Sequence, residues 1–138
     1  MKIDKTTQFN CKKEDWLKGL DFLNWFRYYH LIKDVTSLDR KNVLEIGGGS
    51  GLVRNCLEPL TSNYTTLDIN DNLSPEVVAD VCINVPELKN KFDCVIAADI
   101  FEHIPFDTVQ SAVSNLYSYL EEGGVALITI PHRQSIFL

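Results

Sequence analysis

The sequence predicts an α/β fold in which helices cover both faces of a mainly parallel sheet. Two observations support this prediction. Short apolar runs rich in β-branched residues alternate with helical patterns from residue 43 onward, and no internal repeat or low-complexity segment interrupts them. Strands that alternate with helices form parallel sheets through right-handed crossovers. We therefore expect a Rossmann-like three-layer sandwich.

A helix dense in aromatic residues is expected ahead of the sheet, over residues 13–37. Its apolar side chains recur at spacings of three and four, and Gly19 is the one residue that interrupts the pattern. Such a helix could pack on the sheet and fill the core, or it could cover a pocket and shape the site of a second ligand. We treat the chain as one domain, with residues 1–38 as a helical cap and residues 39–138 as the core.

Five strands and two further helices are expected after the cap. The strands are marked by β-branched and aromatic residues, and the helices by apolar residues on one face. The second of these helices should end at Gly123 and Gly124, because glycine favours helix termination. The expected strands cover residues 43–46, 64–69, 77–82, 93–98 and 125–130, and the helices cover residues 52–58 and 107–120.

Composition limits the partners and the location of the protein. Apolar residues make up 45% of the chain and charged residues 23%, as in ordinary soluble domains. The net charge of −6 repels phosphate backbones, so nucleic acid is a less favoured partner. No apolar run could span a bilayer and the start MKIDKTTQFN is not a signal peptide, so we expect a cytoplasmic protein without a membrane contact. The four cysteines are scattered, which predicts reduced thiols and no metal site.

The run VLEIGGGSG is the most informative stretch of the chain. Gly47, Gly49 and Gly51 follow an apolar strand, and Glu45 stands just ahead of them. Glycines at such positions allow a sharp turn and let a bulky ligand lie against the backbone. A dinucleotide fingerprint would need glycine in place of Leu52, and a phosphate-binding P-loop would need a lysine that this loop lacks. The pattern is therefore acid-x-Gly-x-Gly-x-Gly, and we expect a nucleotide-like ligand.

This pattern resembles the first motif of class I S-adenosylmethionine-dependent methyltransferases, and the resemblance extends over about residues 40–133. It implies S-adenosylmethionine as the methyl donor and a small molecule as the acceptor. In this family the loop carries the methionine part of the donor and lies beneath its sugar, which assigns that role to Gly47, Gly49 and Gly51. Glu45 would lie near the positively charged amino and sulfonium groups.

Acidic residues after the second and third expected strands fit the same resemblance. Asp68 matches the family's ribose-binding acid, because one carboxylate accepts hydrogen bonds from both hydroxyls, and Asp71 is the competing candidate in the same loop. Ile69 would then flank the adenine. Asp80 resembles the acid that meets the adenine amino group, and Val81 or its neighbour would supply a backbone amide and an apolar wall.

The segment ADIFEHIP, which follows the fourth expected strand, resembles the corresponding segment of the family. Asp99 would face the donor pocket. His103 is the candidate catalytic residue, because histidine exchanges protons near neutral pH, although in many family members the Glu102–His103 pair is structural. His132 could approach an acceptor, and His30 is expected to be packed or at the surface of the aromatic helix.

Family members usually continue beyond the fifth strand with another helix and an antiparallel pair of strands, whereas this sequence ends at Leu138. We therefore expect a sheet that lacks the last strands of the family fold. The strand over residues 125–130 would then be an exposed edge, which favours pairing with a second copy in a homodimer. Two alternatives stay open: a donor-binding module without turnover and, disfavoured by Leu52, a nicotinamide-dependent oxidoreductase.

Overall fold

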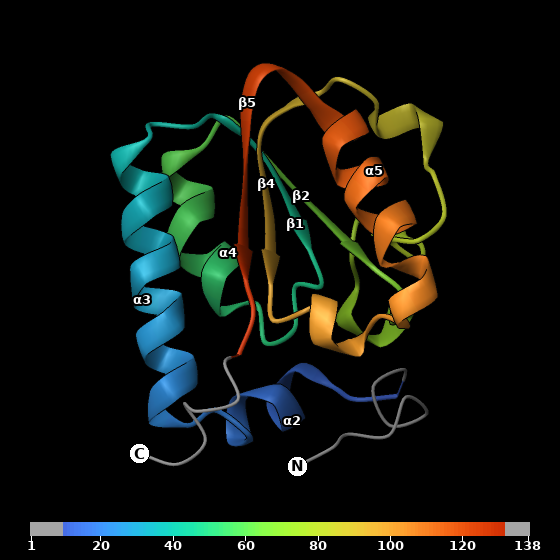
Figure 1. Cartoon of the computed structure of the whole chain (residues 1–138). Helices are drawn as coiled ribbons and strands as arrows, with labels where there is room; N and C mark the ends of the chain where they lie inside the picture. The colour runs from blue at the N-terminus through green and yellow to red at the C-terminus, as the bar shows by residue number, and fades with distance from the viewer. Residues whose placement is uncertain (1–9, 132–138) are drawn as a thin grey trace.

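The computed structural model describes residues 10–131, whose five strands form one parallel sheet (Figure 1). The strand order is β3-β2-β1-β4-β5, so β1 lies in the centre and the chain order reverses beside it. The predicted α/β fold is confirmed. The strands are β1 (Asn42–Ile46), β2 (Asn63–Asp68), β3 (Val77–Val78), β4 (Phe92–Ala98) and β5 (Leu120–Thr129).

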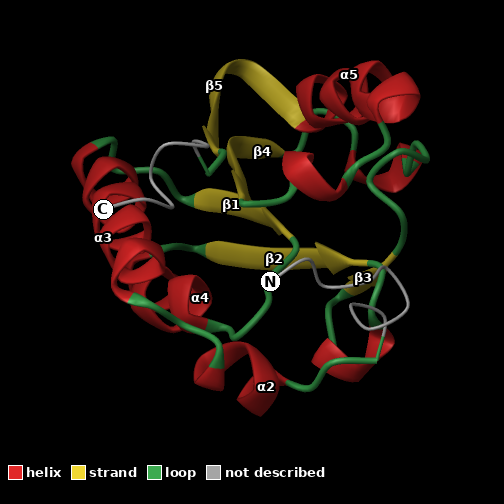
Figure 2. Cartoon of the chain, turned by 60° about the horizontal axis from the view of Figure 1, so that its bottom comes forward, coloured by secondary structure: helices red, strands yellow, loops and turns green. Residues whose placement is uncertain are grey.

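Helices cover both faces of this sheet. The helices α3 (Phe22–Ser37) and α4 (Leu52–Leu57) lie on one face, and α5 (Val109–Tyr119) lies on the other (Figure 1). A shorter helix, α2 (Lys13–Lys18), lies beyond the end of the sheet at which the strands terminate (Figure 1), on the same side as α4 (Figure 2). Among the described residues, no helix has the length and apolar character needed to cross a membrane.

The two faces of the sheet are covered by separate apolar clusters. On one face, Leu31 and Val35 of α3 pack with Val43 of β1. On the other face, Leu116 of α5 belongs to the cluster that contains Leu44. Neighbouring residues of a strand point to opposite faces, so β1 contributes to both clusters, and its Val43 and Leu44 are fully buried. The central strand is therefore fixed from both sides, and its end is a rigid base for the loop that follows.

The prediction of a single helix over residues 13–37 is wrong, because this segment forms two helices, α2 and α3, that are separated after Gly19. Asp21 begins α3: its side chain accepts the backbone N–H of Asn24 at 2.9 Å, and the Asn24 side chain accepts the N–H of Asp21 at 3.1 Å. This reciprocal cap stabilises a new helix start. The two interpretations of the aromatic segment thus apply to different parts: α3 packs on the sheet, and α2 lies beyond the strand ends.

Two other boundaries differ from the prediction. The strand expected at residues 77–82 is shorter, because the Asp80 side chain accepts the N–H of Cys82 at 2.8 Å and turns the chain away. The strand expected at 125–130 begins earlier, at Leu120, so Gly123 lies within β5 and does not end the preceding helix. Among residues 10–131, no strand pairs with the outer side of β5, and a homodimer along this edge stays a prediction.

Gly47 turns the chain out of β1 with a φ of +72°, a conformation that costs other residues about 1–2 kcal/mol. A Cβ at this position would collide with Cδ1 of Ile100 and lie 3.1 Å from its Cγ1. We predict that Gly47→Ala lowers the free energy of unfolding by about 2 kcal/mol or more, measured by urea denaturation.

Gly51→Ala is the matched control. Gly51 has a similar φ of +78°, but a Cβ there would meet no atom within 4 Å. This control should cost only the backbone strain, about 1 kcal/mol. Adding Ile100→Val to Gly47→Ala removes the colliding Cδ1 and should recover part of the loss. Equal losses in the two glycine variants would contradict the contact with Ile100.

Candidate functional site

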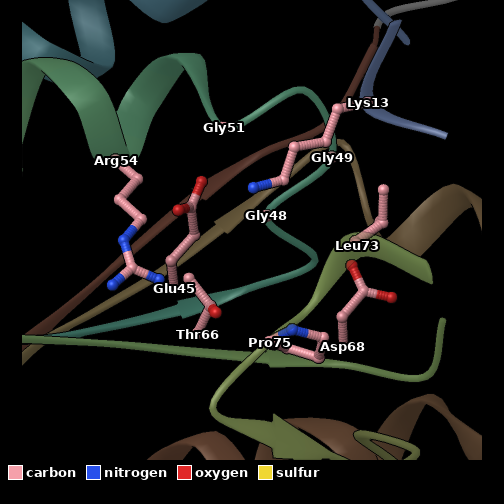
Figure 3. Close-up of a pocket in the computed structure, with 10 residues that line it drawn as sticks. All are labelled: Lys13, Glu45, Gly48, Gly49, Gly51, Arg54, Thr66, Asp68, Leu73 and Pro75. Carbon is pink, nitrogen blue, oxygen red and sulfur yellow. The ribbon is translucent and has the colours of Figure 1, made fainter. Parts of the chain in front are cut away.

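A pocket lies at the carboxyl ends of β1 and β2, beside α4 (Figure 3). Carboxyl ends of parallel strands are where α/β proteins bind their ligands. Four residues predicted to bind the donor line this pocket together, namely Glu45, Gly49, Gly51 and Asp68. The complete lining is Lys13, Glu45, Gly48, Gly49, Gly51, Arg54, Thr66, Asp68, Leu73 and Pro75.

The glycine loop gives this pocket a wall of bare backbone. A Cβ at Gly51 would meet no atom within 4 Å, and one at Gly49 would come no closer than 3.9 Å to another atom. The φ angles of both residues lie in the left-handed region, which glycine adopts without strain. The backbone at these positions therefore borders open space. Gly47 does not line the pocket, and it packs against Ile100.

The Asp68 carboxylate lies at the end of β2 and is almost fully buried. Its Oδ1 accepts the backbone N–H of Asn70 at 2.9 Å. Burial raises the pKa of Asp68, while hydrogen bonds from the backbone of its own loop and of the glycine loop act in the opposite direction. Asp71, the competing candidate, is exposed and is not part of the pocket lining. The structure thus places Asp68, and not Asp71, in the pocket.

Glu45 is only 2% exposed, although it belongs to a strand in the middle of the sheet. Its Oε2 accepts the phenol O–H of Tyr64 at 2.9 Å. Burial raises the pKa of Glu45 to about 8, while the hydrogen bond from Tyr64 and the charge of Arg54 lower it. The carboxyl group is therefore mostly protonated at neutral pH unless a further cation comes close.

Arg54 reaches the same pocket from α4, but carboxylates already neutralise its charge. Its Nη2 lies 2.7 Å from Oε1 of Glu76 and 3.0 Å from Oε1 of Glu58. Glu76 also accepts the hydroxyl of Thr66 at 2.7 Å, which fixes this group beside β2. An anionic ligand would therefore gain little from Arg54.

Asp99, expected to face the donor pocket, lies outside the pocket lining. Its Oδ2 accepts hydrogen bonds from Nη2 and Nε of Arg27 at 2.9 Å and 3.1 Å. Its Oδ1 accepts the hydroxyl of Thr129 at 3.0 Å. Asp99 therefore joins α3 to the ends of β4 and β5.

The three residues expected around the adenine also lie outside the pocket lining. Ile69 is exposed, and Asp80 accepts the N–H of Cys82 within its own turn. Val81 is buried in the core, and its carbonyl accepts the side-chain amide of Asn115 at 2.8 Å. Their roles toward adenine stay predictions.

His103 lies in the turn Phe101–His103 that follows β4, and its side chain is partly exposed. Burial lowers the pKa of His103, which favours the neutral imidazole, the form that can accept a proton. Its Nε2 is 3.8 Å from Oε1 of Glu102, too far for a hydrogen bond. The catalytic role of His103 stays a prediction, and His132 lies outside the described residues.

Comparison with known proteins decides the family. A family model described as a methyltransferase domain matches residues 22–136. The chain belongs to this family of methyltransferase domains. The match confirms the resemblance that the glycine loop indicated. No curated protein matches the sequence.

Several solved structures share the fold of this methyltransferase domain. The N-methyltransferase NodS from Bradyrhizobium japonicum, in complex with S-adenosylhomocysteine, aligns with a TM-score of 0.69 at 18% identity, over 82% of this chain and 64% of NodS. DesVI from Streptomyces venezuelae aligns with a TM-score of 0.66 at 15% identity, over 100% of this chain and 62% of DesVI. The sugar N-methyltransferase KedS8 from a Streptoalloteichus species aligns with a TM-score of 0.65 at 18% identity, over 80% of this chain and 50% of KedS8. The methyltransferase domain thus matches 50–64% of the length of these proteins.

Sequence reasoning missed six of the ten residues that line the pocket, three of them with polar side chains: Lys13, Arg54 and Thr66. Arg54 stands four residues before Glu58, a spacing typical of an ordinary ion pair on a helix surface. Lys13 belongs to the segment that was expected to form one long helix. No local pattern marks these residues, because only the folded chain brings them close to Glu45.

The buried Glu45 carboxyl group makes the stability of the methyltransferase domain depend on pH. In the unfolded chain Glu45 loses its proton near pH 4.5, whereas the folded protein holds this proton up to about pH 8. We predict that its contribution to the free energy of unfolding is fully present below about pH 4.5 and is lost as the pH rises to about 8. The loss should be on the order of a few kcal/mol and is measured by urea unfolding across this range.

Glu45→Gln is the control for this measurement. Glutamine keeps an oxygen that accepts the Tyr64 hydroxyl, but it does not titrate. The difference in free energy of unfolding between the two proteins should change across the pH range. A constant difference would show that Glu45 does not cause the pH dependence.

Proposed function

We propose that this domain binds S-adenosylmethionine in the pocket at the ends of β1 and β2 and transfers its methyl group to a small-molecule acceptor. The observation that supports this most directly is the position of two buried carboxyl groups, those of Glu45 and Asp68, beside the bare backbone of Gly49 and Gly51. Membership of the methyltransferase-domain family supports the reaction class.

The chemistry of S-adenosylmethionine fits these groups. Its methionine end carries an ammonium, a sulfonium and a carboxylate, and its nucleoside end carries two ribose hydroxyls. A cation near Glu45 would favour the ionised carboxylate and offset the cost of burying it. Asp68 can accept hydrogen bonds from both hydroxyls, and the glycine loop lets a bulky ligand lie against the backbone.

The protein's main task is then to position the reactants and exclude water. When bound, S-adenosylmethionine supplies a methyl group that its sulfonium has already activated. Holding reacting atoms in line at about 3–3.5 Å contributes much of the rate enhancement in such reactions. The helix α2 lies beyond the strand ends (Figure 1), and the Arg27–Asp99 ion pair ties α3 to the end of β4. These elements would exclude water around the reacting atoms.

Amines are the first class of acceptor to test. NodS is named as an N-methyltransferase and KedS8 as a sugar N-methyltransferase, and both share the fold of this chain. An amine attacks the methyl carbon only when it is neutral, so an ammonium acceptor must first lose a proton. We propose His103, which follows β4 and has a lowered pKa, as the group that accepts this proton.

A second candidate function is donor binding without turnover. The observation that favours this alternative is that His103, the candidate base, lies outside the lining of the donor pocket. Release of S-adenosylhomocysteine in the presence of candidate amines separates the two functions.

A nicotinamide-dependent oxidoreductase is less favoured because Leu52 stands where the dinucleotide fingerprint needs glycine. Competition between NAD and S-adenosylmethionine for binding tests this third candidate.

Binding of the donor should depend on Asp68. We predict that isothermal titration gives a micromolar dissociation constant for S-adenosylmethionine, about −8 kcal/mol. Asp68→Ala should weaken this binding about tenfold or more, because hydrogen bonds to a charged acceptor contribute about 1.5–3 kcal/mol each. Asp71→Ala, an exposed carboxylate of the same loop, should leave the affinity unchanged. Equal heats for wild type and Asp68→Ala, or no heat for either, would contradict the proposal.

His103→Asn should separate donor binding from proton transfer. We predict an unchanged affinity for S-adenosylmethionine, because His103 does not line the pocket. With an amine acceptor, release of S-adenosylhomocysteine at neutral pH should fall on the order of 100-fold, and the loss should shrink above the pKa of the acceptor. Turnover that is unaffected at every pH would exclude His103 as the base.

A further inference from the structure

Lys13 is the first residue of α2 and extends from the end of the sheet into the pocket. Figure 3 shows its side-chain nitrogen pointing toward the carboxyl group of Glu45, past the glycine loop. Within residues 10–131, however, no carboxylate lies within ion-pair distance of this ammonium. The charge of Lys13 is therefore directed into the pocket without being neutralised there.

The other cation of the pocket differs in this respect. Arg54 pairs with both Glu58 and Glu76, at distances of 3.0 Å and 2.7 Å. A guanidinium held by two carboxylates has little remaining attraction for a third. Among the described residues that line the pocket, Lys13 is thus the one cation able to bind an anionic group of a ligand.

The charges of the methionine end provide such a group. The ammonium and the sulfonium suit the carboxyl group of Glu45, but the carboxylate of the ligand would be repelled by Glu45 and Asp68. It needs a cation at the side of the pocket opposite these acids. We infer that Lys13 binds the carboxylate of the donor's methionine portion, an inference that rests on the proposed function. Lysine is a common partner for such groups, because its ammonium offers three donors on a flexible stem.

This arrangement also gives α2 a role in recognition. α2 has no buried residue of its own, so its position beyond the strand ends depends on contacts along its pocket-facing side. Trp16, one turn after Lys13, lies 4.0 Å from the position that a Cβ of Gly49 would occupy. Lys13 and Trp16 thus both face the glycine loop, and an ion pair with the ligand would hold α2 in the same place. In this way Lys13 discriminates donors that have the amino-acid carboxylate from those that lack it.

The test compares two ligands and three variants by isothermal titration. S-adenosylhomocysteine has the carboxylate, whereas S-adenosyl-3-thiopropylamine keeps the adenosine and the amino group but lacks the carboxylate. Wild type should bind S-adenosylhomocysteine on the order of tenfold or more tightly than the amine. Lys13→Met should remove this preference by weakening only S-adenosylhomocysteine, and Lys13→Arg should restore most of it. Lys18→Met, an exposed lysine of the same helix outside the pocket, should behave as wild type.

Three results would overturn the inference. If Lys13→Met weakens both ligands equally, Lys13 only positions α2. If it tightens both, Lys13 competes with the ligand's ammonium for Glu45. If it changes neither, Lys13 makes no contact with the ligand. Failure of the proposed function looks different, because wild type would then bind neither ligand.

Discussion

The Asp68 carboxylate joins the two loops on which the site depends. It ends β2, its Oδ1 accepts the N–H of Asn70 at 2.9 Å, and backbone groups of the glycine loop after β1 lie close enough to lower its pKa. The N–H of Gly47 adds a bond to the carbonyl of Leu67 at 2.8 Å, which continues the pairing of β1 with β2 beyond the strand. Hydrogen bonds to a charged acceptor are stronger than those between neutral groups. The same carboxylate therefore shapes the glycine loop and offers acceptor oxygens beside it.

The ionisable groups around this pocket differ in how many hydrogen-bond and ion-pair partners they have. Arg54 is held by two carboxylates, whereas within residues 10–131 Glu45 accepts a hydrogen bond from one group, the hydroxyl of Tyr64. Burial of Glu45 in the central strand raises its pKa and costs stability at neutral and higher pH. A buried acid of this kind is difficult to explain by folding alone, because an apolar residue would cost less there. Its position suits a ligand that carries positive charge.

The strands and the centre of the site could be predicted from the sequence because both have local causes. Apolar β-branched runs mark the strands, and the glycines and Asp68 come directly after them. The break between α2 and α3 could also have been found, since Asp21 and Asn24 form a reciprocal cap after Gly19. The apolar residues keep their helical spacing across the break, so the pattern favoured one long helix.

Other parts of the site could not be predicted, because they arise from contacts between segments that are far apart in the sequence. The ion pair between Arg27 and Asp99 joins residues that are 72 positions apart, so no local pattern reveals that Asp99 bonds to α3. Lys13 is one of several lysines in a polar segment, and only the fold directs it toward Glu45. Family resemblance likewise marks residues that follow the strands, but it does not show which of them face the pocket.

The small size of α2 determines how an affinity at this site should be interpreted. With six residues and none buried, α2 is far shorter than the roughly 12–15 residues at which an isolated helix becomes stable. The segment just before α2 is held by the bond of the Asn70 side chain to the carbonyl of Cys11 at 2.9 Å. A ligand that contacts α2 must therefore offset the conformational entropy lost when this segment becomes more rigid. The measured binding free energy will be smaller than the sum of the contacts, with a favourable enthalpy partly cancelled by entropy.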